Sequence, residues 1–552
     1  MRWNIIQQIT SKNKKTRTKE IVKKILKNRE LISKNQIDRF LSTKDPLSIS
    51  LKEVDIDSKQ VSIAITRIKE AIENKEEIIV FGDYDADGIT ATAILWETLH
   101  ELGARVLPFI PHREKHGYGL STKAIDSLLE DKDPKLIITV DNGIVAHEAV
   151  DYIKQKNIDC IITDHHVSSD SLPKADAIIH TTKLAGAGVS WIFSREIIKK
   201  LNKEEIETSK NTLDLATIGT VADQVPLIEN NRNIVKAGLI FLKNTKRPGL
   251  LALFKQSDFD PKVLSAYHIN YIIGPRINAM GRLAHGLDSL RILCTKNNTQ
   301  AKNLADLLSD TNKERQDITF ELLQLAKEVV GEVEGKLIIV DHSDFHEGVI
   351  GLVAGKLAET HYRPSIVIGK GKKTSKASAR SVKGINIIEL IRKAEDLLIN
   401  AGGHPMAAGF TIETGKISEF KKVLLEIARK EIDEELLTPL ISIDCQINIE
   451  DISWELFESL KGLEPHGMGN KKPVFCIKNV KVLEKMTIGR DKNHLKIILP
   501  SEVKKQTSIE ALWFGHGQDS DNIKDEVNIA FTVDENTWNG RSKLQLFIKD
   551  IQ

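Results

Sequence analysis

The chain lacks the charge excess and the cysteine pattern that mark several specialised classes of protein. Its Lys and Arg residues barely outnumber its Asp and Glu residues, 79 against 77, so the net charge is +2. This balance gives no sign of the strongly basic surface that many nucleic-acid-binding proteins carry. The few cysteines are scattered and form no CxxC pair, which argues against a structural zinc site; they are Cys160, Cys294, Cys445 and Cys476.

Long apolar runs are also missing. None approaches the length of a membrane span, so we expect no membrane association. The first residues, MRWNIIQQIT, do not have the layout of a signal peptide, and we therefore expect a cytoplasmic location. A length of 552 residues is ample for about three domains with real hydrophobic cores.

Three short acidic strings are present instead, and each follows an apolar run. GDYDADG occupies residues 82–88, VDNG occupies 140–143 and DHH occupies 164–166. The preceding runs are short and rich in Ile and Val, which is typical of buried parallel strands; they are Ile78–Phe81, Leu136–Val140 and Cys160–Thr163. Helical patterns separate the runs, at Gly88–Leu102, Ser121–Leu129 and Val145–Lys156. Alternating strands and helices predict an α/β fold with a doubly wound parallel sheet.

The acidic strings should meet at one edge of that sheet, because ligands bind at the carboxyl ends of parallel strands. Each string alone has a plainer interpretation, such as a turn, a calcium loop or a helix cap. Together they bring so many carboxylates to one place that a pair of divalent cations is the simplest compensation. Mg²⁺ and Mn²⁺ suit such oxygen ligands, and two ions can activate water against a phosphoryl group. The sequence therefore predicts a metal-dependent phosphoesterase, in which Asp141 of the middle string is well placed to bridge two ions.

The remainder of the chain predicts further domains. Residues 1–76 look like a helical lead-in to a catalytic domain at 77–298. An amphipathic pattern over 299–332 predicts a long linker helix, followed by a second, smaller α/β domain at 333–438. Residues 439–552 contain many short strands and few helices, as expected of a small β-barrel such as an OB-fold.

The motifs and their order resemble the DHH phosphoesterase family. GDYDADG, VDNG, DHH and the GTVAD of residues 219–223 follow one another as they do in that family. GPRINAMGR at 274–282 and LEPHGMGN at 463–470 are similar to stretches of its RecJ branch, the bacterial single-strand-specific exonucleases, and AGGHPMAAG at 401–409 resembles the DHH-associated domain. The resemblance covers roughly residues 50–552, and it implies a DHH catalytic domain, a DHH-associated domain and an OB-like domain.

The resemblance also implies a role for individual residues. The implied metal ligands are Asp83, Asp85, Asp87, Asp141, His165 and Asp223, with Asp83 and Asp164 left open between direct ligation and indirect support. The implied catalytic residues are Asp85, Asp87, Asp141, His165, His166 and Asp223. The implied substrate-binding residues are Arg276, Asn278, Arg282, Arg380 and His404.

The implied activity is 5′-to-3′ degradation of single-stranded DNA in recombination and repair, with two Mn²⁺ or Mg²⁺ ions. We expect a monomer that works with a helicase or a single-strand-binding protein. A DHH-type oligonucleotide or cyclic dinucleotide phosphodiesterase is one alternative, but such enzymes generally need only the two α/β domains. A non-catalytic single-stranded-DNA-binding relative is the other, although this chain keeps every acid and both histidines.

Overall fold

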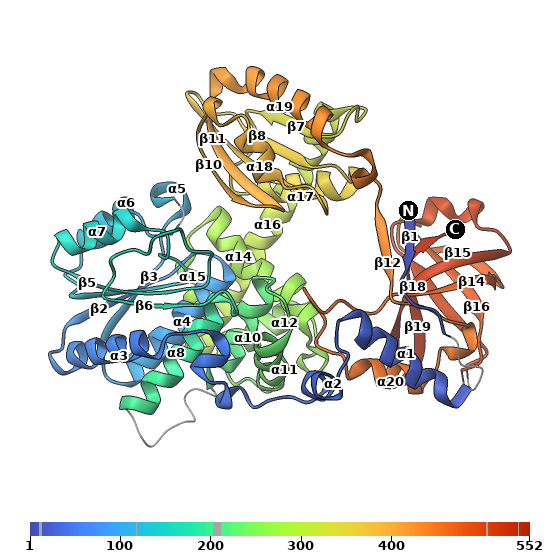
Figure 1. The fold of residues 1–552 in the computed structure, drawn as a ribbon, viewed down its shortest axis with the longest axis horizontal. Helices are drawn as coiled ribbons and strands as arrows, with labels where there is room; N and C mark the ends of the chain where they lie inside the picture. The colour runs from blue at the N-terminus through green and yellow to red at the C-terminus, as the bar shows by residue number, and fades with distance from the viewer. Residues whose placement is uncertain (10–13, 118, 202–210, 504–505, 539) are drawn as a thin grey trace. The chain divides into compact units, whose positions relative to one another are not determined.

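The computed structural model describes residues 1–9, 14–117, 119–201, 211–503, 506–538 and 540–552 (Figure 1). Two compact units are present, and each combines segments that are distant in the sequence. The first contains residues 1–54, 224–240 and 440–552, and the second contains residues 55–223 and 241–439. Within the described ranges, no helix has the length and apolar character needed to cross a membrane.

The second unit is built on a five-stranded parallel sheet with the order β3-β2-β4-β5-β6. Its strands are β2 (Glu77–Phe81), β3 (Arg105–Phe109), β4 (Leu136–Val140), β5 (Asp159–Asp164) and β6 (Ala177–His180). The predicted strands correspond to β2, β4 and β5, whereas β3 and β6 were not predicted. After β2 the chain adds β3 on one side of that strand and then β4 on its other side. Such a topological switch point is where open α/β sheets bind ligands.

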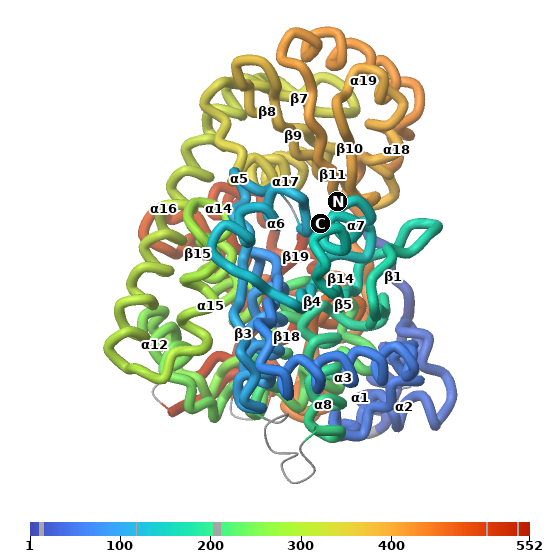
Figure 2. The backbone as a smooth tube through the Cα atoms, turned by 90° about the vertical axis from the view of Figure 1, so that its left-hand side faces the viewer, coloured from blue at the N-terminus to red at the C-terminus, as the bar shows by residue number. Residues whose placement is uncertain are grey.

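Helices cover both faces of this sheet, which confirms the predicted doubly wound architecture. Helices α6 (Thr122–Leu129) and α7 (His147–Gln155) lie above the sheet in both views, and α3 (Ser58–Glu73) and α8 (Gly186–Leu201) lie below it (Figures 1 and 2). Helix α4 (Ala86–Glu101) packs on α8. It begins two residues earlier than predicted, because the Asp85 carboxylate caps it by accepting a hydrogen bond from the Gly88 amide at 2.9 Å.

A helical region completes the catalytic part of this unit. Its helices are α10 (Leu213–Ala222), α12 (Pro248–Gln256), α13 (Ala266–His268), the π-helical η4 (Ile269–Ile273), α14 (Gly274–Leu283) and α15 (Leu287–Cys294). The predicted linker helix is present as α16, which runs 33 residues from Asn298 to Val330.

The linker helix leads into the predicted smaller α/β domain. Its five strands have the order β10-β11-β9-β8-β7, and only β7 and β8 run parallel. The strands are β7 (Ile338–His342), β8 (Ser365–Gly369), β9 (Thr374–Arg380), β10 (Leu398–His404) and β11 (Ala407–Glu413), with helices α17 (Ile350–His361), α18 (Ile387–Arg392) and α19 (Ile417–Glu431).

The first unit contains a seven-stranded sheet with the order β13-β14-β18-β19-β17-β16-β15. The strands are β13 (Cys445–Gln446), β14 (Phe475–Lys481), β15 (Glu484–Ile488), β16 (His494–Pro500), β17 (Ser508–Trp513), β18 (Glu526–Trp538) and β19 (Arg541–Ile551). Their number agrees with the predicted β-rich C-terminal domain, although β18 and β19, with 13 and 11 residues, are longer than the predicted short strands.

The N-terminal residues belong to the same unit as this sheet. Strand β1 (Arg2–Ile5) pairs in parallel with β12 (Leu440–Ile443). Helices α1 (Lys14–Asn28) and α2 (Lys34–Leu41) contribute Ile21, Ile25 and Phe40 to the core that also contains α20 (Trp454–Lys461). The stretch predicted as one lead-in is therefore shared between the two units, and only α3 belongs to the unit with the catalytic sheet.

Candidate metal centre and cavity

Four of the predicted ligands meet at the carboxyl edge of the parallel sheet. Nε2 of His165, which follows β5, lies 3.1 Å from Oδ1 of Asp141, which follows β4. The same nitrogen lies 3.7 Å from Oδ2 of Asp223, at the end of α10, and 3.8 Å from Oδ2 of Asp87, in the first turn of α4. These atoms form two groups whose potential ligand atoms lie within 4.8 Å of one another: Asp141, His165 and His166, and Asp87, His165 and Asp223.

Small residues allow this close approach. A Cβ atom at Gly186 would lie 2.4 Å from Oδ1 of Asp141, and one at Gly219 would lie 2.5 Å from Oδ1 of Asp87. The Asp87 carboxylate accepts hydrogen bonds from the Gly186 and Ala187 amides, at 2.7 and 2.9 Å, at the start of α8. Asp141 has a φ of 61°, a left-handed conformation that is uncommon for non-glycine residues and that directs its side chain at the end of β4. Larger residues at Gly186 and Gly219 would therefore displace the carboxylates.

Asp83 and Asp85 lie on the loop after β2 and outside the two groups of converging ligand atoms. Asp83 is buried, and its Oδ1 accepts a hydrogen bond from the Tyr84 amide at 2.6 Å. The Asp85 carboxylate caps α4, as described above. The negative charges of Asp83 and Asp85 act electrostatically on the centre, because they contribute to the raised pKa of the Asp141 carboxyl. The loop therefore adds negative charge next to the four converging residues.

Asp164 organises the DHH segment through its two carboxylate oxygens. Oδ1 accepts hydrogen bonds from the amides of His165 and His166 and lies 2.8 Å from Nδ1 of His166. Oδ2 accepts a hydrogen bond from the Ile144 amide at 2.9 Å, which ties this segment to the loop after β4. Burial alone would lower the pKa of His166, but its hydrogen bond with Asp164 and the charge of that carboxylate raise it to about 9. Asp164 thus orients both histidines and favours a charged His166.

The electrostatics of the centre fit divalent cations. Burial, followed by repulsion from neighbouring acids, raises the pKa of Asp87 and of Asp141, and burial together with Asp85 raises that of Asp223 to about 6. Burial lowers the pKa of His165 to about 4, so its imidazole is neutral and able to bind metal. Asp141 Oδ1 and His165 Nε2 are both buried and lie 3.1 Å apart, but neither makes a hydrogen bond of regular geometry within the described part of the chain. Carboxylate oxygens with one imidazole suit Mn²⁺ and Mg²⁺, so the residues present fit both ions.

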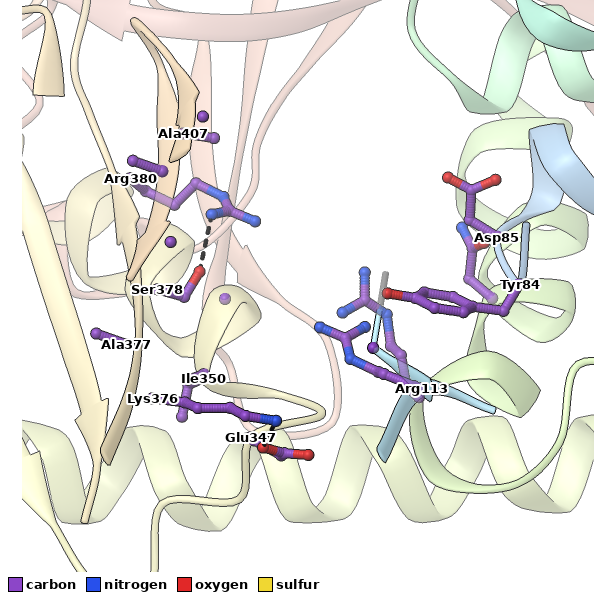
Figure 3. A pocket seen from close by; sticks show the side chains of 17 residues that line it. Tyr84, Asp85, Arg113, Glu347, Ile350, Lys376, Ala377, Ser378, Arg380 and Ala407 are labelled. Carbon is purple, nitrogen blue, oxygen red and sulfur yellow. Dashed lines mark hydrogen bonds and ion pairs between the residues drawn. The ribbon is translucent and has the colours of Figure 1, made fainter. Parts of the chain in front are cut away.

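An arginine-lined cavity of about 530 Å³ adjoins this centre and includes Asp85 in its wall. Tyr84, Asp85 and Arg113 lie on one side, and Ser378 and Arg380 of the smaller domain face them (Figure 3). The Arg113 guanidinium lies 5.4 Å from the centroid of the Tyr84 ring. Arg380 donates to the Ser378 hydroxyl at 3.1 Å and to the Ala379 carbonyl at 2.8 Å.

The arginines of this cavity repel one another. Burial, followed by the charges of Arg113, Arg315 and Arg380, lowers the pKa of Arg282 to about 10. Burial and the charge of Arg113 also lower the pKa of Arg380. An anion such as a phosphate group would relieve this repulsion, and guanidinium groups present a fork that matches phosphate oxygens.

The predicted substrate-binding residues differ in their placement. Asn278, Arg282 and Arg380 line the cavity. Arg276 instead donates to the Ser309 hydroxyl at 3.2 Å and to the Ile272 carbonyl at 2.8 Å, so its guanidinium is bonded within the helical region. His404 is exposed at the end of β10, beside the lining residue Gly403.

Sequence reasoning missed Tyr84, Arg113 and Lys376, which also line the cavity. Arg113 begins α5 (Arg113–His116), four residues after β3 ends, so it too follows the carboxyl end of a parallel strand. A prediction of β3 would have drawn attention to it.

Asn278 also supports the acidic loop. Its Oδ1 accepts a hydrogen bond from the Ala86 amide at 2.7 Å, between two of the predicted ligands. One turn further along α14, a Cβ atom at Gly281 would lie 2.4 Å from the Tyr84 carbonyl oxygen, so only glycine permits this approach. Helix α14 therefore lies against the loop after β2 and helps to fix its conformation.

Comparisons with known proteins agree with this fold. Residues 77–220 match the N-terminal domain of the DHH family, residues 334–430 match the DHHA1 domain and residues 443–550 match the RecJ OB domain. These three matches, in this order, define the class as a DHH-family protein with an associated domain and an OB domain.

Individual relatives refine this class. The chain is 34% identical, over its whole length and 70% of the relative, to the single-stranded-DNA-specific exonuclease RecJ of Bacillus subtilis. It is 31% identical to the RecJ of Escherichia coli, over 89% of this chain and 90% of the relative. The chain belongs to the RecJ family.

Solved structures show the same relationship. The crystal structure of RecJ from Thermus thermophilus in complex with Mn²⁺ matches all of this chain and 79% of its own, with a TM-score of 0.83 and 28% identity. A structure of the same protein in complex with Mg²⁺ matches with a TM-score of 0.77 and 27% identity, over all of this chain and 78% of its own. Homologous proteins thus bind both of the ions that the sequence predicted.

Proposed function

We propose that this protein is a metal-dependent exonuclease that hydrolyses the phosphodiester bonds of single-stranded DNA. The observation that carries the proposal is the meeting of His165 with Asp87, Asp141 and Asp223 beside an arginine-lined cavity. The first part can hold cations, and the second can hold phosphate groups. The RecJ relatives of this chain are single-stranded-DNA-specific exonucleases, which supports the choice of single-stranded DNA.

The residues that would hold the two ions are Asp83, Asp85, Asp87, Asp141, His165 and Asp223. When bound, such a pair of divalent ions activates a water molecule and neutralises the charge that develops on the phosphoryl group. The chain's own residues do the rest of the work. Arg282 and Arg380 hold phosphate oxygens in the cavity, together with Asn278 and Arg113. His166, kept charged by Asp164, stabilises or protonates the departing oxygen. Arg276 and His404 stay in the proposed substrate-binding set as weaker, peripheral contacts, because neither lines the cavity.

We extend this proposal to the finer features that the family resemblance implies. Degradation runs from 5′ to 3′ and serves DNA recombination and repair. The protein acts as a monomer in the cytoplasm, together with a helicase or a single-strand-binding protein. The division into functional parts at residues 76, 298, 332 and 438 also stays a prediction.

An assay with end-labelled DNA tests the proposal. Single-stranded and duplex substrates, labelled at the 5′ or the 3′ end, are incubated with Mn²⁺, with Mg²⁺ or with a chelator. We expect stepwise degradation of single strands with either metal, and none with chelator or in the Asp141→Asn variant. Faster turnover of the shortest oligonucleotides or of a cyclic dinucleotide would favour the phosphodiesterase alternative. Binding of single strands without hydrolysis in Mn²⁺ would favour the non-catalytic one.

A further inference from the structure

Two tyrosines form an exposed aromatic pair on the catalytic part of the second unit. The Tyr267 and Tyr271 side chains are 62% and 67% exposed, and their ring centroids lie 4.7 Å apart with an interplanar angle of 35°. Burial of aromatic surface normally stabilises a fold, so two large rings held together in solvent need another explanation.

The pair lies on the helical run that also supplies residues of the cavity. Tyr267 is on α13 and Tyr271 is on the π-helical η4, which continues directly into α14 with Asn278 and Arg282. Seven residues separate Tyr271 from Asn278, which corresponds to about two helical turns and about 10 Å. A Cβ atom at Gly274, where α14 begins, would lie 3.5 Å from Cβ of Ala222, the residue before Asp223. The aromatic pair is therefore close, along this run, to both the metal centre and the cavity.

The surrounding segment has an unusual charge for this chain. Residues 241–276 contain six Lys and Arg residues against two Asp residues, a net charge of +4, whereas the whole chain has a net charge of +2. Arg247 and Arg276 are bonded within the fold, and the other four, Lys243, Lys246, Lys255 and Lys262, are exposed. The charge of Lys243 reaches His268, between the two tyrosines, and adds to the burial that lowers the pKa of this histidine. The segment thus combines exposed aromatic rings with a net positive charge, and Lys243 acts electrostatically next to the rings.

We propose that Tyr267 and Tyr271 form a stacking site for bases of the single-stranded DNA, outside the cavity, with Lys243 attracting its phosphates. Every base has a face that can stack on an aromatic ring, so such a site binds single strands with little sequence preference. A duplex hides these faces, and the site would therefore favour unpaired substrate. This proposal depends on the proposed nuclease function. The same chemistry could attract an acidic peptide, but the continuity with the cavity favours the DNA strand.

Binding and turnover of tyrosine variants test the proposal. Tyr267→Ala, Tyr271→Ala, the double alanine variant and the double Phe variant are compared with wild type by fluorescence anisotropy, using a strand of about 20 nucleotides, longer than common single-strand binding sites. Chelator is present, so the strand stays intact. We expect each alanine to raise the Kd about tenfold, because one stacked base contributes roughly that much affinity. The double Phe variant keeps the rings and should bind within about twofold of wild type.

Phe320→Ala provides a matched control, since Phe320 is 63% exposed on α16. It should leave the Kd unchanged, and all variants should keep the thermal unfolding midpoint of wild type. Turnover at saturating DNA with Mn²⁺ should also be retained. Wild-type affinity in the double alanine variant would overturn the stacking site, even if an acidic peptide then proved to bind there. Absence of nuclease activity in wild type would instead overturn the proposed function.

Discussion

The metal centre and the arginine cavity lie side by side in the second unit and carry opposite uncompensated charge. In the centre, burial and mutual repulsion raise the pKa of Asp87 and Asp141, so these carboxylates resist ionisation without a counter-charge. In the cavity, burial and mutual repulsion lower the pKa of Arg282 and Arg380. Each region is thus unfavourable in the protein alone, and each would be relieved by one component of a metal-bound phosphodiester.

Asp141→Asn should separate the function of the metal centre from its stability. We expect cleavage to fall about 10³-fold or more, because the ions contribute several kcal/mol to the transition state. A carboxyl with a raised pKa stabilises the fold only at low pH and destabilises it once ionised. The metal-free variant should therefore unfold at a higher temperature than metal-free wild type at neutral pH. A lower midpoint for the variant would contradict the electrostatic account.

Arg282→Ala should weaken DNA binding about 10- to 100-fold, because a charged hydrogen bond contributes about 1.5–3 kcal/mol. Arg276→Ala is the matched control, since both arginines lie on α14 and only Arg282 lines the cavity. We expect Arg276→Ala to lower the thermal midpoint while changing the affinity much less. Equal losses of affinity in the two variants, measured by anisotropy in chelator, would remove the distinction between them.

Asn278→Ala should raise the Mn²⁺ concentration needed for half-maximal activity about tenfold, the range in which residues that support ligands act. The reason is the lost hydrogen bond from the Ala86 amide, which holds the loop of Asp85 and Asp87. Asn278→Asp keeps an acceptor oxygen and should restore most of the metal response. An unchanged metal requirement, with a higher KM for DNA alone, would show that Asn278 serves the substrate rather than the loop.

His466 of the first unit is another buried titratable side chain, and we expect a smaller effect from its substitution. Burial, followed by the charges of Arg29 and Lys472, lowers its pKa to about 3. The neutral form is favoured in the fold, so stability present above about pH 6.5 is lost as the pH falls. Between pH 7 and 5, we expect the free energy of unfolding to fall by about 1–2 kcal/mol less in His466→Gln than in wild type. The reason is that one pKa unit corresponds to about 1.4 kcal/mol. Parallel loss of thermal midpoint in the two proteins over this range would contradict the assignment.

The convergence of the acids could be predicted from the sequence because it follows from local patterns. Buried parallel strands are apolar along their whole length, and residues after them meet at one edge. Strand β3 has a weaker sequence pattern than the other strands, because it contains Pro108 and is not apolar throughout. Arg105 and Leu107 are exposed, and only Val106 between them is buried. The absence of this strand from the prediction also hid Arg113, which follows it.

The composition of the first unit could not be predicted in this way. Arg232 donates hydrogen bonds to the carbonyls of Phe40 and Leu463, at 3.1 and 3.0 Å, and so joins three distant segments of the chain. Such contacts leave no periodic signal in any one of the segments. The same reason explains why Arg276 and Arg282 looked equivalent in the motif, although their partners differ.

Calorimetric titration of the metal-free protein with Mn²⁺ tests the central claim most directly. We expect two ions to bind per chain, with release of protons from the carboxylates, and at least one ion to be lost in Asp141→Asn. No binding in wild type, or the same stoichiometry and affinity in wild type and Asp141→Asn, would contradict this claim.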